Sequence, residues 1–148
     1  MYTHLLIPTD GSPLSDDALE RGLALAGKLG ARVTILTVVE PFYMYTASEE
    51  HFGEAREQYE KHAREAARAI LEAARERAAA LGVEARVKLV GSEHPDQAII
   101  DAAVEHGCDL VAMASHGRRG VNALLLGSVT QEVLTRSTVP VLVFRPPA

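Results

Sequence analysis

The sequence predicts an α/β domain whose five-stranded parallel sheet carries helices on both faces. Five short runs rich in aliphatic and β-branched residues alternate with four stretches whose apolar residues recur at helical spacing. Strands that are separated by helices cannot be simple hairpins, so they pair in parallel through right-handed crossovers. Glycine, proline and aspartate punctuate the boundaries between these runs.

The first two strands flank a well-marked helix. The apolar run at 4–10 is the first expected strand, and it breaks at an Asp-Gly turn. A helix follows, because Ser12 is a good N-cap and Pro13 suits the first helical position. The β-branched run at 31–39 is the second strand. The apolar positions of the helix and its closing glycine are Leu19, Leu23, Ala26, Leu29 and Gly30.

The middle of the chain predicts a long helix and a strand near a sheet edge. Residues 42–52 have no clear period and are expected to form a loop. The run at 83–90 alternates apolar and polar residues, as in a strand with one wet face. A helix is expected over about 54–81, since one apolar stripe runs along it. The stripe consists of Ala55, Tyr59, Ala63, Ala66, Ile70, Ala74 and Ala78.

Two further strands and two helices complete the pattern. A helix beginning at Pro95 precedes the fully apolar run at 108–114, which predicts a buried strand. A helix over about 128–136 and a last strand at 139–144 follow. We expect a single domain, 1–148, because a chain of this length buries a sizeable core.

Composition and charge exclude several classes of protein. A formal net charge of −5 disfavours general nucleic-acid binding, which needs a basic face. The longest apolar runs are too short to span a membrane, and the N-terminal stretch lacks a secretory signal pattern. The single cysteine, Cys108, is expected to be an inert core residue. His51 and His62 are spaced too irregularly to form a metal site. The expected location of the protein is the cytoplasm.

Two loops fall where such a sheet places its ligands. Ligands of parallel sheets bind beyond the carboxyl ends of the strands, where the strand order reverses. If the first and fourth strands are central neighbours, the reversal falls between them. The loops at that point are PTDGS at 8–12 and ASHGRRG at 114–120. We therefore expect both loops to line the crevice.

The residue types of these loops suit a phosphorylated, sugar-bearing ligand. Gly117 and Gly120 allow positive φ and close approach of a ligand to the main chain. The N–H groups of a helix that begins at Ser128, after Gly127, form a ready anion site. Asp10 suits sugar hydroxyls. The two arginines that add charge-assisted bonds to phosphate are Arg118 and Arg119. A nucleotide fits this set.

Each of these features also has a purely structural interpretation. Ser128 and Gln131 fit a capping box. The loop glycines and Asp10 suit tight turns, and the two arginines suit a solvated surface. His116 is expected to be a solvated loop histidine rather than a ligand contact.

Nucleotide-binding and catalytic motifs of other classes are absent. There is no P-loop pattern G-x-x-x-x-G-K-[ST], and no G-x-G-x-x-G follows the first strand. The acidic and lysine positions of a phospho-acceptor receiver domain are not filled, and no Ser-His-Asp or Cys-His arrangement is signalled. Since no residue stands out as a poised general base or nucleophile, the sequence leans against an enzyme.

Four segments carry a family resemblance. They are LLIPTDGS at 5–12, ILTVVEP at 35–41, DLVAMASHGRRGVNALLLGSVTQEVL at 109–134 and STVPVLVFR at 137–145. On these segments the chain resembles the universal stress protein family over essentially its full length. The resemblance implies a Rossmann-like fold of the adenine nucleotide alpha hydrolase type, with strand order 3-2-1-4-5.

The ATP-binding branch of that family carries the pattern G-x2-G-x9-G-[ST]. This sequence has A-x2-G-x9-G-S, in which Ala114 replaces the first glycine and Gly117, Gly127 and Ser128 fill the other positions. The alanine adds one methyl group where the main chain is expected to approach the ligand.

The resemblance also implies a ligand, a site and an assembly. It implies ATP, with Mg or Mn held through the phosphates, Asp10 towards the ribose and the main chain of Val38 at the adenine. A homodimer through the last strand, 139–144, is expected, because this apolar edge is otherwise unprotected. The implied nucleotide-binding residues are Pro8, Thr9, Asp10, Val38, Val39, Met113, Ala114, Gly117, Arg118, Gly127, Ser128 and Val129.

Three interpretations of function stay open at this point. The leading one is an ATP-binding regulatory module of the stress response whose occupied state is sensed by a partner. The second is a nucleotide-free, dimeric interaction protein of the same family, which Ala114 favours. The third is an enzyme such as a slow ATPase.

Overall fold

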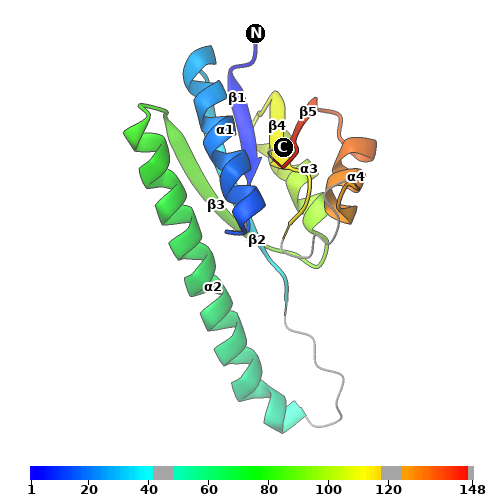
Figure 1. The fold of residues 1–148 in the computed structure, drawn as a ribbon. Coiled ribbons are helices and arrows are strands. Elements are labelled where there is room, and N and C mark those ends of the chain that lie inside the picture. Colours follow the sequence, from blue (N-terminus) through cyan, green and yellow to red (C-terminus); the bar gives the residue numbers. More distant parts are fainter. Residues whose placement is uncertain (42–48, 118–124, 147–148) are drawn as a thin grey trace.

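The computed structural model describes residues 1–41, 49–117 and 125–146, which form alternating strands and helices (Figure 1). The strands are β1 (His4–Pro8), β2 (Arg32–Val39), β3 (Ala85–Gly91), β4 (Leu110–Ala114) and β5 (Val141–Phe144). The helices are α1 (Pro13–Leu29), α2 (Glu49–Ala80), α3 (Pro95–Glu105) and α4 (Ser128–Arg136). None of the described helices combines the length and the apolar character that crossing a membrane requires.

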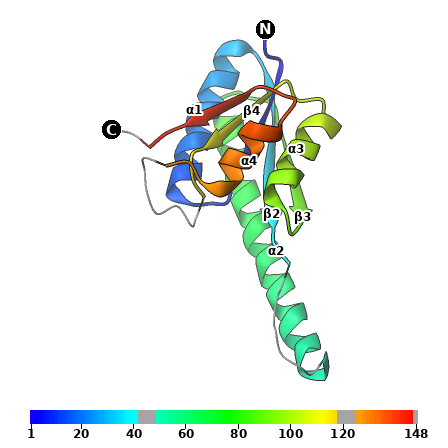
Figure 2. The same cartoon turned by 90° about the vertical axis from the view of Figure 1, so that its right-hand side faces the viewer.

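The strands form one parallel sheet of order β3-β2-β1-β4-β5. Helices α1 and α2 lie on one face of this sheet, and α3 and α4 lie on the other (Figures 1 and 2). The expected five-stranded parallel sheet, its order 3-2-1-4-5 and its two helical layers are therefore confirmed. The strand order reverses between β1 and β4, which is where the sequence predicts the ligand crevice.

Successive side chains of β1 point to opposite faces of the sheet, so this strand contributes to the hydrophobic cores on both faces. Leu5 and Ile7 face α1 and α2, whereas Leu6 faces α3 and α4, and all three side chains are fully buried. This pattern is typical of a central parallel strand that is covered on both faces. The central strands therefore fix the position of the loops that follow them.

Several expected boundaries differ from the structure, and among them the expected strands 83–90 and 108–114 are β3 (Ala85–Gly91) and β4 (Leu110–Ala114). Helix α2 begins at Glu49, so the expected loop 42–52 is helical at its end, while 42–48 lie outside the described residues. Strand β1 ends at Pro8, because the side chain of Asp10 turns to accept a bond from the Ser12 N–H. Strand β5 begins at Val141 rather than at 139, since Pro140 has no N–H to donate.

Helix α1 starts and ends as its sequence predicts. Ser12 is the N-cap, and its hydroxyl accepts a 3.3 Å bond from the Ser15 N–H. Pro13 follows at the first helical position. Gly30 closes the helix in the left-handed region with φ 66°, where a side chain would be strained.

The amino ends of the strands hold a buried histidine. His4 is 6% exposed, and its Nε2 lies 2.7 Å from the Thr34 hydroxyl, while its Nδ1 has no hydrogen-bond partner among the described residues. Burial lowers the pKa of His4, and the nearby Arg32 adds to this effect. The neutral imidazole is therefore the form that the fold favours.

The free energy of unfolding is expected to decrease as the pH is lowered, because of His4. In the unfolded chain the pKa is near 6.5, and in the folded chain it is lower, so the unfolded state binds the proton more readily. The stabilising contribution is complete above pH 6.5 and is lost as the pH falls through the folded pKa. One such site gives a slope of at most about 1.4 kcal/mol per pH unit. Urea unfolding between pH 8 and pH 5 measures it.

A pair of glutamine variants isolates this effect. His4→Gln cannot be protonated and should flatten the slope between pH 8 and pH 5. His62→Gln, at an exposed position of α2, should leave the slope unchanged. An equal slope in His4→Gln and the wild type would assign the pH dependence to other groups.

Candidate functional site

A cavity of about 800 Å³ lies at the carboxyl ends of the central strands. Its walls come from the end of β2, from α2, from the first residues of α3 and α4, and from the segments that follow β1 and β4. This is the side of the sheet and the reversal point at which the sequence places the crevice. A volume of this size accommodates a small organic ligand.

The structure brings most of the expected site residues to this cavity. The members of the expected set that line it are Asp10, Val38, Val39, Gly117, Gly127, Ser128 and Val129. They come from four separate segments of the chain, so only the fold brings them together.

Other expected residues lie behind the lining. Thr9, Met113 and Ala114 are 5%, 5% and 7% exposed, and Met113 packs in the core beneath α3 and α4. Pro8 is the last residue of β1 and is half-buried. Arg118, like the neighbouring Arg119, lies outside the described residues.

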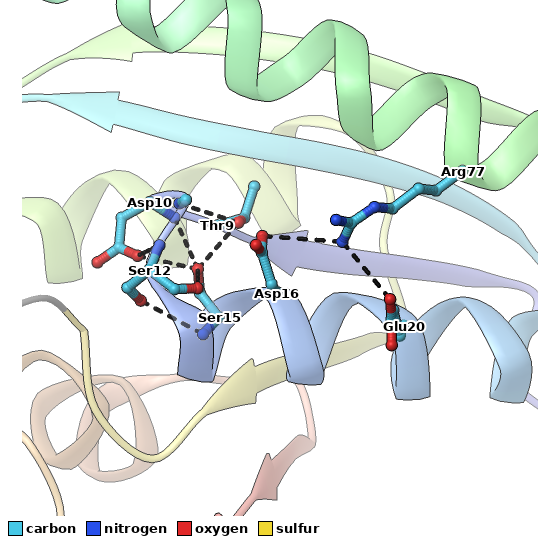
Figure 3. Close-up of polar contacts among 8 residues, drawn as sticks. Thr9, Asp10, Ser12, Ser15, Asp16, Glu20 and Arg77 are labelled. Carbon is cyan, nitrogen blue, oxygen red and sulfur yellow. Dashed lines mark hydrogen bonds and ion pairs between the residues drawn. The ribbon is translucent and has the colours of Figure 1, made fainter.

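Asp10 is held rigidly beside Gly117. Its Oδ1 accepts bonds of 2.9 Å from the Ser12 N–H and 2.9 Å from the Ser15 hydroxyl (Figure 3). A Cβ atom at Gly117 would lie 2.8 Å from the Asp10 Oδ2, so no larger residue fits there without displacing the carboxylate. Close approach therefore explains this glycine. The expected positive φ at Gly117 is wrong, since the described glycines with positive φ are others.

Helix α4 presents its first turn to the cavity. Gly127 is the N-cap and accepts the first helical bond, from the Gln131 N–H. The N–H groups of Ser128, Val129 and Thr130 come before this first helical donor and so have no acceptor within the helix, and all three residues line the cavity. Such N–H groups and the positive end of the helix dipole favour an anion.

The expected capping box at this helix is wrong. Ser128 is the first helical residue rather than the N-cap, and the cap makes no side-chain bond. The Gln131 side chain instead donates a 2.8 Å bond to the carbonyl oxygen of Leu126. The N–H of Gly127 donates to the carbonyl oxygen of Ser115 at 2.8 Å, which fastens the helix start to the end of β4.

His116 is buried, which contradicts the expected solvated loop histidine. It is 6% exposed, and its Nδ1 lies 3.2 Å from the Ser115 hydroxyl. The ring lies under the start of α4, because a Cβ atom at Gly127 would be 3.6 Å from the His116 Cδ2. His116 also lines the cavity. It is therefore a packed wall of the site.

The main chain of Val38 faces the crevice. The carbonyl oxygen of Leu36 accepts a bond from the Thr9 N–H on the β1 side, and that of Val39 accepts one from the Ser92 N–H on the β3 side. Alternation along a parallel strand places the N–H and C=O of Val38 on the β1 side. Pairing with β1 ends at Leu36, so these groups lie beyond the end of β1.

Sequence reasoning missed the wall that α2 contributes. Tyr59, Ala63, Ala66, Ala67 and Ile70 line the cavity. Four of these belong to the predicted apolar stripe, which was used only to predict the helix. The stripe does reach the core at Ala74 and Ala78, whose side chains are buried. The length of the stripe could have predicted this wall, because a helix of this length extends beyond the sheet (Figures 1 and 2).

The lining of the cavity is acidic. Asp10, Glu40, Asp96 and Glu132 belong to it, and the described residues add no lysine or arginine to it. Arg136 lies outside the lining and pairs with Asp96 at 3.4 Å and with Glu132 at 3.9 Å. At the wall formed by α3 and α4, the positive charge of Arg136 therefore offsets part of the negative charge that an anionic ligand would meet.

The fold and this crevice define the class of the protein. It is a Rossmann-like α/β protein with a cavity at the strand ends, where the strand order reverses. Residues 1–145 match the model of the universal stress protein family, and the chain belongs to that family.

Relatives and solved structures agree with this assignment. The universal stress protein YxiE of Bacillus subtilis is 35% identical over 153 residues, which cover 98% of this chain and 100% of the relative. The solved structure of MJ0577, a universal stress protein of Methanocaldococcus jannaschii, has a TM-score of 0.84 at 27% identity and covers 100% of this chain and 99% of that one. A universal stress protein solved in complex with cAMP has a TM-score of 0.68 at 27% identity and covers 97% of each chain.

Proposed function

We propose that this protein binds ATP in the crevice and acts as a nucleotide-dependent regulatory module. The observation that carries the proposal is the convergence, on one cavity, of the first turn of α4, the Asp10 carboxylate and the main-chain edge of Val38. These are partners for phosphate, for sugar hydroxyls and for a base. The structural relative in complex with cAMP supports an adenine nucleotide.

Each expected residue has a place in this proposal. The N–H groups of Ser128 and Val129 receive phosphate oxygens, and Gly117 and Gly127 keep the approach open. Asp10 accepts the ribose hydroxyls, and Val38, with Val39 beside it, meets the adenine edge. Arg118 adds charge to the phosphates. The residues proposed to support the site from behind are Pro8, Thr9, Met113 and Ala114.

A divalent cation that travels with the phosphates fits the charge of the cavity. Four carboxylates line it, from Asp10, Glu40, Asp96 and Glu132. Mg or Mn bound to the triphosphate would reduce the repulsion between the phosphates and these carboxylates. Such an ion supplies charge neutralisation, and the protein residues orient the nucleotide.

Calorimetric titration with Mg-ATP and Mg-GTP tests the proposal. We expect binding of ATP, weaker binding of GTP, and a higher melting temperature with saturating ATP, because the ligand binds only the folded state. Native mass spectrometry of the purified protein is the companion measurement. No heat with either nucleotide at millimolar concentration would favour the nucleotide-free interaction protein.

We also propose a homodimer through β5. This strand is the outer edge of the sheet, paired with β4 on its inner side. Leu142 in its middle is 36% exposed, although the strand is apolar throughout. Pairing this edge with its twofold copy would cover it.

A further inference from the structure

Ser15 on α1 is a buried serine that sequence reasoning did not single out. Its side chain is 4% exposed, and its hydroxyl lies 2.9 Å from the Asp10 Oδ1 (Figure 3). The residue stands in the first turn of the helix, behind the turn that carries Asp10. It therefore contacts the site without lining the cavity.

The hydrogen bonds around Ser15 form a directed network. Its oxygen lies 3.0 Å from the Thr9 hydroxyl and accepts a 3.2 Å bond from the Asp10 N–H. The Thr9 oxygen in turn accepts a bond from the Gly11 N–H. Because the carboxylate only accepts, the arrangement in which Thr9 donates to Ser15 and Ser15 donates to Asp10 satisfies every group.

This network fixes the orientation of the Asp10 carboxylate. Oδ1 accepts from both the Ser15 hydroxyl and the Ser12 N–H, so the plane of the carboxylate cannot rotate without breaking a charge-assisted bond. Oδ2 then lies beside Gly117, and both residues line the cavity. A carboxylate fixed in this way can distinguish a hydroxyl from a hydrogen at a set position.

We propose that Ser15 is a positioning residue that sets the selection of ribose hydroxyls by Asp10. This inference rests on the proposed nucleotide-binding function and deepens it. Ser15 touches no ligand atom. Its role is to hold one carboxylate oxygen so that the other meets the sugar in a single geometry.

The test compares Mg-ATP with Mg-2′,3′-dideoxy-ATP, which lacks both ribose hydroxyls. In calorimetric titrations we expect the wild type to prefer ATP by about tenfold, the discrimination of one charge-assisted hydrogen bond. In Ser15→Ala the preference should fall to about threefold or less. The ratio of the two affinities is independent of any general loss of stability.

Two further variants separate positioning from structure. Ser12→Ala removes the helix cap that Ser15 N–H uses, but it keeps the Ser12 N–H bond to Asp10. It should lower the melting temperature and leave the tenfold preference intact. Ser15→Thr restores a hydroxyl and should restore the preference.

Each remaining outcome overturns a different statement. A wild type that binds neither nucleotide refutes the proposed function and this inference with it. A wild type that binds both equally refutes the ribose role of Asp10 while ATP binding stands. A Ser15→Ala protein that weakens both ligands equally, or neither, refutes the positioning role alone.

Discussion

Replacing Gly127 by valine is expected to lower the affinity for ATP at least about tenfold, roughly 1.4 kcal/mol. A Cβ atom there would lie 3.3 Å from the carbonyl oxygen of Ser115 and 3.4 Å from the Cα of His116. Both are main-chain atoms, and the branched valine side chain extends further. The first turn of α4 must therefore move away from the end of β4, together with the N–H groups proposed to bind phosphate.

Calorimetric titration of the folded protein measures this loss, with circular dichroism as the check on folding. Gly53→Val is the matched control, because in the described part of the chain no atom outside its own stretch of helix α2 lies within 4 Å of a Cβ atom at that position. We expect the control to bind ATP as the wild type does. If folded Gly127→Val also binds ATP with wild-type affinity, the first turn of α4 does not hold the phosphates.

The sequence predicted the fold well because the relevant signals are local. Alternating apolar runs, the Ser12 cap and the left-handed Gly30 identify elements without reference to the rest of the chain. The errors fall at the ends of elements. Pro140 shortens β5, and α2 begins at Glu49 rather than near residue 54.

The candidate site was predicted in part, for a related reason. Loop chemistry and family resemblance pointed to Asp10, Gly117 and Gly127, and all three line one cavity. His116 and Ser15 were missed or misjudged, because their burial depends on segments that are distant in the sequence or on a side-chain network. No local pattern reports such contacts.

The physical reason for the glycine at 117 also differs from one that was expected. Conformational freedom was invoked at Gly117, yet its φ is not positive, and Gly127 has φ −64° and ψ 157°, which any residue adopts. What these positions exclude is a Cβ atom, against the Asp10 carboxylate in one case and the main chain of Ser115 in the other. A substitution at either position is therefore expected to act by displacing these neighbouring atoms, not by straining the backbone.

The proposed homodimer through β5 is expected to dissociate when Leu142 is replaced by lysine. Val141 and Val143 pack against the core beneath α3 and α4, so lysine at either position would disturb the fold itself. Phe144 packs in the other core, and Arg21 lies 4.7 Å from the centre of its ring. Leu142 belongs to neither core and is 36% exposed, which makes it the position that reports on the edge.

A twofold interface contains Leu142 twice, so the substitution removes two apolar contacts and places two lysines close together. We expect the dissociation constant to rise at least about 100-fold, roughly 3 kcal/mol, which gives monomer at micromolar concentration. Sedimentation velocity measures the change. Leu81→Lys is the control, because Leu81 is 56% exposed and precedes β3 at the opposite edge of the sheet. A wild type that is already monomeric, or a Leu142→Lys protein that remains dimeric, would show that β5 is not the interface.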